Sequence, residues 1–304
     1  MSEFIAFYIK KYAMMAVISS VTMVAAFPTW GERGEGTGYI ATLDFAIAET
    51  LIEMTEFPVA MGGVDNYKSW TEDDLLAGQQ VDIGSNPQPN KELLSTLDLE
   101  TILIPLQYTH LKKDLASIAP MAALSPYNGR PLSGWKKMRV FTKELGAHTE
   151  RESEARRLIA DAEERMIRLN ETVASFRQPL LLVQFLDARH VRIYGRNSLP
   201  GIVLERLGLR NAWDGPSSRW GISIVGIGEL FNIDAHFVIV DTSHLPSKSL
   251  TQAAVMGSEL WGQLPSVRAG SVTLLDADFW VFGAIPSAMR LAESLVTVLI
   301  DASS

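Results

Sequence analysis

The chain has 304 residues, no cysteine and a formal net charge of −8. Nucleic-acid phosphates are bound by clustered Lys and Arg, so this acidic balance argues against a nucleic-acid partner. A chain without cysteine forms no disulfide, and its stability must therefore come from its hydrophobic core.

The first 26 residues have the features of an export signal, and we interpret 1–26 as a signal peptide. Lys10 and Lys11 precede a run from Ala13 to Ala26 that is apolar or small and carries no charge. This run ends in Val-Ala-Ala, which offers the small residues that a signal peptidase reads. It has about 14 residues, fewer than the ~20 that span a bilayer. An uncleaved membrane anchor and a buried first helix remain alternatives. We expect a soluble periplasmic protein.

Short apolar runs alternate with helical patterns from residue 39 to about residue 121. The predicted strands are Tyr39–Leu43, Pro58–Met61, Thr101–Pro105 and Ile118–Met121. Helices are expected near residues 44–54, 75–78 and 91–97. This alternation is typical of a parallel sheet covered by helices. We therefore predict an N-terminal α/β lobe over residues 38–145.

One long helix is predicted over residues 149–177, between two halves of the chain. Thr149 and Glu152 fit a capping box, in which each side chain satisfies a free amide of the other residue. The following apolar residues recur at the spacing of one helical face: Ala155, Leu158, Ile159, Ala162, Met166, Leu169, Val173 and Phe176. No Gly or Pro interrupts this pattern before Pro179, so the helix could reach about 28 residues, or roughly 40 Å. Such a helix would span both halves as a stiff strut.

The same alternation returns over residues 179–304, the predicted C-terminal α/β lobe. Strands are expected at 180–185, 191–194, 237–241 and 271–275, and helices near 199–207, 251–255 and 286–300. The fold class is thus α/β, with two Rossmann-like lobes that have central parallel sheets and are joined by one long helix. No close sequence repeat links the halves, so we predict two similar lobes and no duplication.

Three tryptophans of the C-terminal half lie close to glycine in turn-like segments. The segments are Asn211-Ala212-Trp213-Asp214-Gly215, Arg219-Trp220-Gly221 and Phe279-Trp280-Val281-Phe282-Gly283. Loop aromatics held by a rigid scaffold often line a binding site. The simpler alternative is that these tryptophans cap the hydrophobic core.

Two α/β lobes joined by a long helix resemble the substrate-binding proteins of iron and cobalamin importers. Several strings resemble, more narrowly, the periplasmic ferric-hydroxamate siderophore-binding proteins. Those proteins carry close relatives of Gly195-Arg196-Asn197-Ser198-Leu199, Asn211-Ala212-Trp213-Asp214-Gly215, Trp220-Gly221, residues 260–270 and Phe282-Gly283-Ala284. The resemblance is strong from residue 179 to the end, and weaker but in register over residues 39–97.

This resemblance implies a non-catalytic carrier without a cofactor of its own. Such a carrier captures a ferric siderophore in a cleft between the lobes and delivers it to an inner-membrane ABC permease and its ATPase; we expect a monomer. The positions that match the aromatic cleft walls are Trp70, Tyr108, Trp213, Trp220, Trp280 and Phe282. The hydroxyl of Tyr108 could donate to an iron-bound oxygen. Phe282 stands where the family often has Tyr, so that hydroxyl is lost.

Asn86 marks a second departure from the family. The family places a cleft arginine two residues after the glycine that matches Gly84, and an amide brings no charge to that place. Arg196, Arg219 or Lys68 could supply a cation instead, or the ligand differs in charge from ferrichrome-like chelates. Asn86 and Arg196 therefore join the candidate ligand-binding residues, although Arg196 could also be a surface or ion-pair residue.

Two glutamates are candidates for docking to the permease. Carriers of this architecture present one acidic residue on each lobe to arginines of the permease. Glu92 is the match in the N-terminal lobe, and Glu229 is the nearest acidic residue to the expected place in the C-terminal lobe. The alternative for each is a solvated charge at a helix end.

Signatures of catalysis and of direct metal binding are weak. The chain has no G-x-S-x-G elbow, and its five histidines include no H-E-x-x-H motif. We therefore predict no catalytic residue and no metal ligand. A haem or cobalamin carrier of the same architecture stays open, because Tyr108 could act as an axial haem ligand. An exported α/β enzyme also stays open, because distant carboxylates can meet in a fold.

Overall fold

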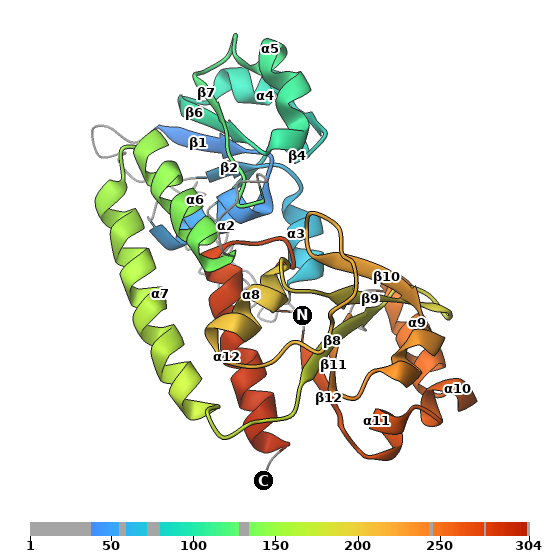
Figure 1. The fold of residues 1–304 in the computed structure, drawn as a ribbon. Coiled ribbons are helices and arrows are strands. Elements are labelled where there is room, and N and C mark those ends of the chain that lie inside the picture. Colours follow the sequence, from blue (N-terminus) through green and yellow to red (C-terminus); the bar gives the residue numbers. More distant parts are fainter. Residues whose placement is uncertain are drawn as a thin grey trace, which may run out of the picture. The chain divides into compact units, whose positions relative to one another are not determined.

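Two five-stranded sheets form the centres of the two lobes (Figure 1). The computed structural model describes residues 38–54, 59–71, 80–127, 134–242, 246–276 and 278–302. The predicted signal peptide, residues 1–26, and the predicted helix at 75–78 lie outside the described residues. None of the described helices is long and apolar enough to cross a membrane.

The sheet of the first lobe is entirely parallel, as predicted. Its strands lie in the order β3-β2-β1-β6-β7. Their bounds are β1 (Tyr39–Thr42), β2 (Val59–Met61), β3 (Val81–Asp82), β6 (Leu99–Ile104) and β7 (Met121–Ala123). Every residue of β1 is buried, because helices cover both faces of a parallel sheet and its strands read as continuous apolar runs.

Short helices and one hairpin complete the first lobe. They are α2 (Phe45–Met54), α3 (Val64–Trp70), α4 (Lys91–Thr96), the 3-10 helix η1 (Leu106–Leu111), α5 (Lys112–Leu115), and the hairpin of β4 (Gly84–Ser85) and β5 (Gln88–Pro89). Asn90 begins α4, since its side chain accepts a hydrogen bond from the Leu93 amide at 3.0 Å. The helices predicted near 44–54 and 91–97 are confirmed.

The sheet of the second lobe is mixed, with the order β10-β9-β8-β11-β12. Its strands are β8 (Leu180–Phe185), β9 (His190–Tyr194), β10 (Ile222–Gly226), β11 (His236–Asp241) and β12 (Val272–Asp276). β8, β11 and β12 are parallel, whereas β9 and β10 run antiparallel to their neighbours. The expectation of a parallel sheet is therefore wrong at this edge. Only four residues join β8 to β9, and so short a connection permits only antiparallel pairing.

The helix between the lobes is shorter than predicted, and the expected capping box is wrong. α7 (Glu152–Thr172) follows α6 (Gly134–His148), a helix that the sequence pattern did not reveal. The Thr149 hydroxyl donates to the Leu145 carbonyl at 2.9 Å, so it satisfies the end of α6 and does not begin α7. Arg151 precedes α7 without a side-chain cap, and it pairs with Glu100 at 3.1 Å.

The two lobes share one continuous hydrophobic core. The last helix, α12 (Ile285–Asp301), packs against α2, α6, α7, β12 and α8 (Leu199–Arg206). Leu291, Leu295 and Leu299 recur along its buried face at helical spacing. They belong to the cluster that contains Ile40 of the first lobe and Leu182 of the second. A layer of helices, and not α7 alone, therefore holds the lobes together.

A smaller core lies on the other face of the second sheet. Trp261 packs against Phe185 and Phe237 there, with ring centroids 5.2 and 6.3 Å apart. The elements around it are the 3-10 helix η2 (Ile227–Asn232), α9 (Pro246–Met256), α10 (Glu259–Gly262) and α11 (Pro265–Arg268). Trp261 thus has a packing role, unlike the loop tryptophans described next.

Candidate functional site

A cavity of about 210 Å³ lies where the two lobes meet. The second lobe contributes Trp220, Trp280 and Phe282 to its lining. The first lobe contributes Asp44, Gln107, Ser125, Pro126 and Tyr127. Aromatic rings with a few convergent polar groups are typical of a small-molecule site.

Three predicted residues form one aromatic wall of this cavity. Phe282 packs edge-on against both tryptophans, with ring centroids 6.5 Å from Trp220 and 5.5 Å from Trp280. Edge-to-face packing of this kind is a favourable aromatic geometry. Trp220 is 41% exposed, so a large part of its ring is available to a ligand.

Trp280 belongs to the second lobe, but its side chain packs against residues of the first lobe. Its ring lies 5.1 Å from Phe45 and 5.8 Å from Trp70, both edge-on. Its backbone amide donates to the Ser287 hydroxyl at 2.9 Å. Trp70 therefore supports Trp280 from behind and is not itself among the residues that line the cavity.

Two glycines fix the loops that carry these rings. Gly221 has a φ of 73°, and a Cβ there would lie 2.0 Å from the Ser198 amide nitrogen at the start of α8. A Cβ at Gly283 would lie 2.4 Å from both Glu49 Oε1 and the Ser287 Cβ. Only glycine permits such close approach of the backbone. The glycines near tryptophan in the sequence are thus the positions at which each loop packs closely, Gly221 against Ser198 and Gly283 against Glu49 and Ser287.

A buried polar network lies behind the Trp280 loop. Glu49 of α2 is 2% exposed. Its carboxylate accepts hydrogen bonds from the Ser287 hydroxyl (2.6 Å), the Arg290 guanidinium (2.8 Å), the Ala284 amide (3.0 Å) and the Tyr67 hydroxyl (3.2 Å). Burial, together with the negative charge of Glu49, raises the pKa of Tyr67, so its hydroxyl stays protonated and can donate. The network joins α2 and α3 to the start of α12.

Asp44 places a carboxyl group on the cavity lining. Its Oδ1 accepts the Ile47 amide at 3.0 Å and caps α2. Burial raises the pKa of Asp44 to about 6, although the backbone amides of Ile47 and Ala46 favour its charged form. Asp44 is not among the site residues predicted from the sequence. One signal was available, since Asp44 follows a buried parallel strand, and ligands of open α/β sheets gather at the carboxyl ends of such strands.

Two tyrosines of the first lobe lie near Asp44. Tyr127 donates its hydroxyl to the Gly283 carbonyl at 3.1 Å, a second link from the first lobe to the Trp280 loop. Tyr108 is half-buried on η1 and packs on the core of the first lobe. Burial and then the charge of Asp44 raise the pKa of Tyr108. Tyr108 is therefore close to the cavity, next to the lining residue Gln107, but does not itself line it.

The structure does not bring Asn86 and Arg196 into the lining. Asn86 is half-buried beside Gly62 and Gly63, and its Oδ1 has no hydrogen-bond partner among the described residues. Arg196 is exposed in the turn before α8. The guanidinium of Arg219 instead lies 4.4 Å from the centre of the Trp220 ring, a cation–π contact at the edge of the aromatic wall.

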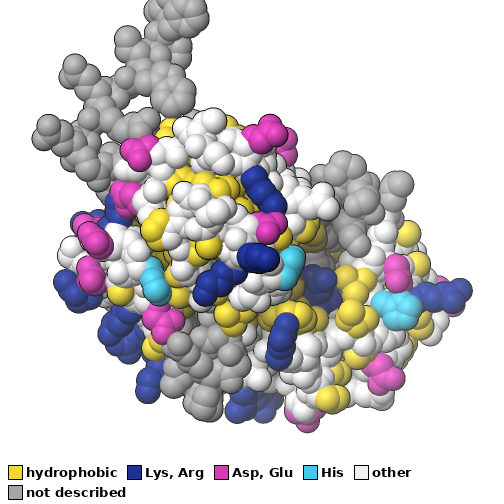
Figure 2. All heavy atoms as spheres, turned by 90° about the horizontal axis from the view of Figure 1, so that it is seen from above, with side chains coloured by type: hydrophobic (Ala, Val, Ile, Leu, Met, Phe, Trp, Pro, Cys, Tyr) yellow, Lys and Arg dark blue, Asp and Glu magenta, His cyan; other side chains and the backbone are white. Residues whose placement is uncertain are grey.

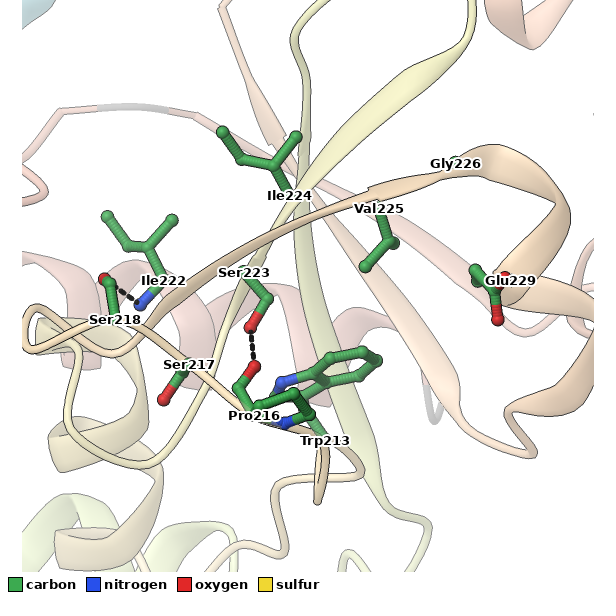
Figure 3. A pocket seen from close by; sticks show the side chains of 10 residues that line it. All are labelled: Trp213, Pro216, Ser217, Ser218, Ile222, Ser223, Ile224, Val225, Gly226 and Glu229. Atoms are coloured by element: carbon green, nitrogen blue, oxygen red, sulfur yellow. Dashed lines mark hydrogen bonds between the residues drawn. The ribbon is translucent and has the colours of Figure 1, made fainter.

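Trp213 lies at a different, larger hollow of about 500 Å³ along β10 (Figure 3). Ser223 and Val225 point toward its ring, whereas Ile222 and Ile224 point to the opposite side of the strand. The Asn211 side chain fixes this turn by accepting the Trp213 amide at 2.9 Å. Serine and aliphatic side chains of one lobe dominate this hollow, so the cavity with the three-ring wall is the stronger candidate site.

The two docking candidates are both exposed, one on each lobe. Glu92 lies in the first turn of α4, and Glu229 lies in the first turn of η2 at the edge of the larger hollow. On the face shown in Figure 2, basic and acidic side chains are interspersed, with hydrophobic side chains exposed between them. Among the described residues, no group of three or more His, Asp or Glu could hold a metal ion.

Comparison with known proteins places this fold among binding proteins. The model of the periplasmic binding protein family matches residues 40–279. The chain is 30% identical over 268 residues to the iron(3+)-hydroxamate-binding protein FhuD of Escherichia coli (strain K12), covering 84% of this chain and 85% of that protein.

Solved structures share the fold at lower sequence identity. The Fe3+–Desferal-bound siderophore-binding protein FhuD from Vibrio cholerae superposes with a TM-score of 0.76 at 22% identity, covering 87% of this chain and 98% of that one. The petrobactin-binding protein YclQ from Bacillus subtilis gives a TM-score of 0.68 at 17% identity, with coverage of 86% and 92%.

Proposed function

Because the chain belongs to the periplasmic binding protein family, we propose that it captures a ferric siderophore of the hydroxamate type and delivers it to an ABC importer. The observation that carries this proposal is the wall of Trp220, Phe282 and Trp280 that faces Asp44 and Tyr127 across the interlobe cavity. The similarity to a hydroxamate-binding protein over most of the chain supports the same ligand class.

The chemistry of such a ligand matches the cavity. In a ferric hydroxamate the chelator supplies the iron-bound oxygens, so the protein needs to recognise the organic shell and not the metal. Flat aromatic rings cover the methylene chains of that shell and remove their apolar surface from water. The cavity of about 210 Å³ is smaller than most ligand pockets, which measure roughly 300–1,000 Å³, so part of the ferric hydroxamate would extend out of it.

The remaining parts of the proposal concern location and delivery. Residues 1–26 direct export, and the mature protein acts as a monomer in the periplasm. It catalyses no reaction. Glu92 on one lobe and Glu229 on the other contact the inner-membrane permease, whose ATPase drives transport. Their exposure on separate lobes supports this role.

Direct titration tests the proposal. The mature protein is titrated by calorimetry with ferrichrome, ferrioxamine B, haem and cobalamin, and with the iron-free hydroxamates as matched controls. We expect saturable 1:1 binding of at least one ferric hydroxamate and weaker binding of its iron-free form. Binding of haem or cobalamin in place of the ferric hydroxamates would contradict the proposal.

A further inference from the structure

Asp44 is the only Asp, Glu, Lys or Arg among the described residues that line the interlobe cavity. Its Oδ1 is occupied by the cap of α2. The backbone amides of Ile47 and Ala46 favour its charged form, no described Lys, Arg or His forms an ion pair with it, and the side chain is half-buried at the cavity. The carboxylate therefore lies on the cavity lining without a cationic partner among the described residues.

The other charged and titratable groups around Asp44 do not cancel its charge. On its own helix, Glu49 is paired with Arg290 at 2.8 Å. On η1 and in the loop after β7, Tyr108 and Tyr127 stay neutral, because burial raises the pKa of both.

The facing loops of the second lobe contribute uncharged rings, Trp220, Trp280 and Phe282. Arg219 stacks on Trp220 but is not among the lining residues. An ionised Asp44 therefore gives the cavity a negative charge with no described cation on its lining to offset it.

We propose that Asp44 makes the site selective for ferric chelates that carry a cationic group, and against chelates that carry an extra carboxylate. This inference rests on the proposed siderophore-binding function of the same cavity. A charge in a partly desolvated site interacts with a ligand charge more strongly than it would in water. The aromatic wall supplies affinity for the organic shell, and the charge of Asp44 discriminates between cationic and anionic ligands.

Protonation of Asp44 gives this selectivity a pH dependence. Burial raises the pKa of Asp44 to about 6. A cationic ligand favours the ionised carboxylate, so its affinity should rise as pH increases from 5 to 7 and then level off. The affinity of a neutral ligand with the same chelate should not rise in this range.

Three probes that share the same iron-binding unit and differ only in the charge of one end group test the proposal. Ferrioxamine B carries a terminal ammonium, its N-acetyl derivative is neutral and its N-succinyl derivative carries a carboxylate. Each is titrated by calorimetry into the wild type, Asp44→Asn and Asp65→Asn. Asp44→Asn keeps an oxygen that can cap α2, and Asp65→Asn makes the same charge change at an exposed position of α3.

We expect the wild type and Asp65→Asn to bind the ammonium form about tenfold or more tightly than the succinyl form, as the sign of the charges requires. Asp44→Asn should reduce this ratio to about threefold or less and remove the pH dependence. Equal binding of all three probes by the wild type would overturn the proposal. The proposal would also be overturned if Asp44→Asn kept the wild-type ratio of affinities for the ammonium and succinyl forms, or if it lost the same affinity for all three probes. If no probe binds the folded wild type, the siderophore-binding function itself fails, and the charge selectivity fails with it.

Discussion

The Arg290 guanidinium of α12 donates to the buried Glu49 carboxylate of α2 at 2.8 Å, and this ion pair joins the two lobes behind the aromatic wall. A buried pair differs from a surface pair in its consequences. Removal of one partner leaves the other charged and without compensation in a desolvated place.

Arg290→Met should therefore lower the free energy of unfolding by about 3–5 kcal/mol, because it leaves the buried Glu49 carboxylate without its ion-pair partner. Urea denaturation measures this loss. The matched control is Arg165→Met, which breaks an exposed pair between Arg165 of α7 and Glu293 of α12 and should cost at most about 1 kcal/mol. Equal losses for the two variants would show that the buried pair has no special role.

Gly283→Ala should destabilise the Trp280 loop, because the added Cβ would lie 2.4 Å from Glu49 Oε1. We expect a loss of about 1–3 kcal/mol from this overpacking, seen as a lower melting temperature. Gly262→Ala is the control, since a Cβ there meets nothing within 4 Å. If Gly283→Ala melts with the wild type, the close approach has no energetic consequence.

Trp220→Ala should weaken siderophore binding alone, whereas Trp280→Ala should weaken both binding and stability. Each loses about 1–3 kcal/mol of siderophore affinity, or roughly 5- to 150-fold, because each removes apolar wall area. Trp220 is 41% exposed, so its loss should leave the melting temperature almost unchanged. Trp280 also packs on Phe45 and Trp70, and its loss should lower the melting temperature as well. Intact affinity in both variants would place the ligand elsewhere.

Asp44→Asn should stabilise the protein at neutral pH. Because burial raises the pKa of Asp44 to about 6, the folded state favours the protonated carboxyl. That contribution is fully present below pH ~4 and is lost as pH rises through 6. The variant should therefore be more stable than the wild type by about 1 kcal/mol at pH 7.5, after discounting for partial exposure, and equal to it near pH 4. Thermal melts at the two pH values check the sign.

Glu92→Lys should weaken transport without weakening ligand affinity. Glu92 is exposed on α4 and is not among the cavity-lining residues, and an electrostatic contact with the permease should depend on salt. Radioactive iron uptake and calorimetric titration measure the two effects separately. Glu171→Lys, the same charge reversal at an exposed position of α7, is the control. A parallel loss of ligand affinity would assign Glu92 to a different role.

Much of the fold follows from local sequence patterns. β1, β8 and α12 were predicted because continuous apolar runs and a helical apolar stripe leave little choice of element. The capping box failed because the Thr149 hydroxyl can serve either of two helix ends. Only the length of α6, which ends at His148, decides between them.

The candidate site was only partly predictable. Trp220, Trp280 and Phe282 stood out because they lie beside glycines, and the structure brings them together in one wall. Asp44 looks in the sequence like an ordinary helix cap, and it is one. Its place on the cavity depends on loops that approach from the other lobe, and no local pattern records that approach.

The position of Trp280 has a consequence for unloading the carrier. The ring belongs to the second lobe in sequence, but it rests on Phe45 and Trp70 of the first. If the permease separated the lobes, the Trp280 ring would lose its contacts with Phe45 and Trp70 in the same movement that widens the cavity. The cargo would then lose a wall of its binding site as its exit opens, and no separate release signal would be required.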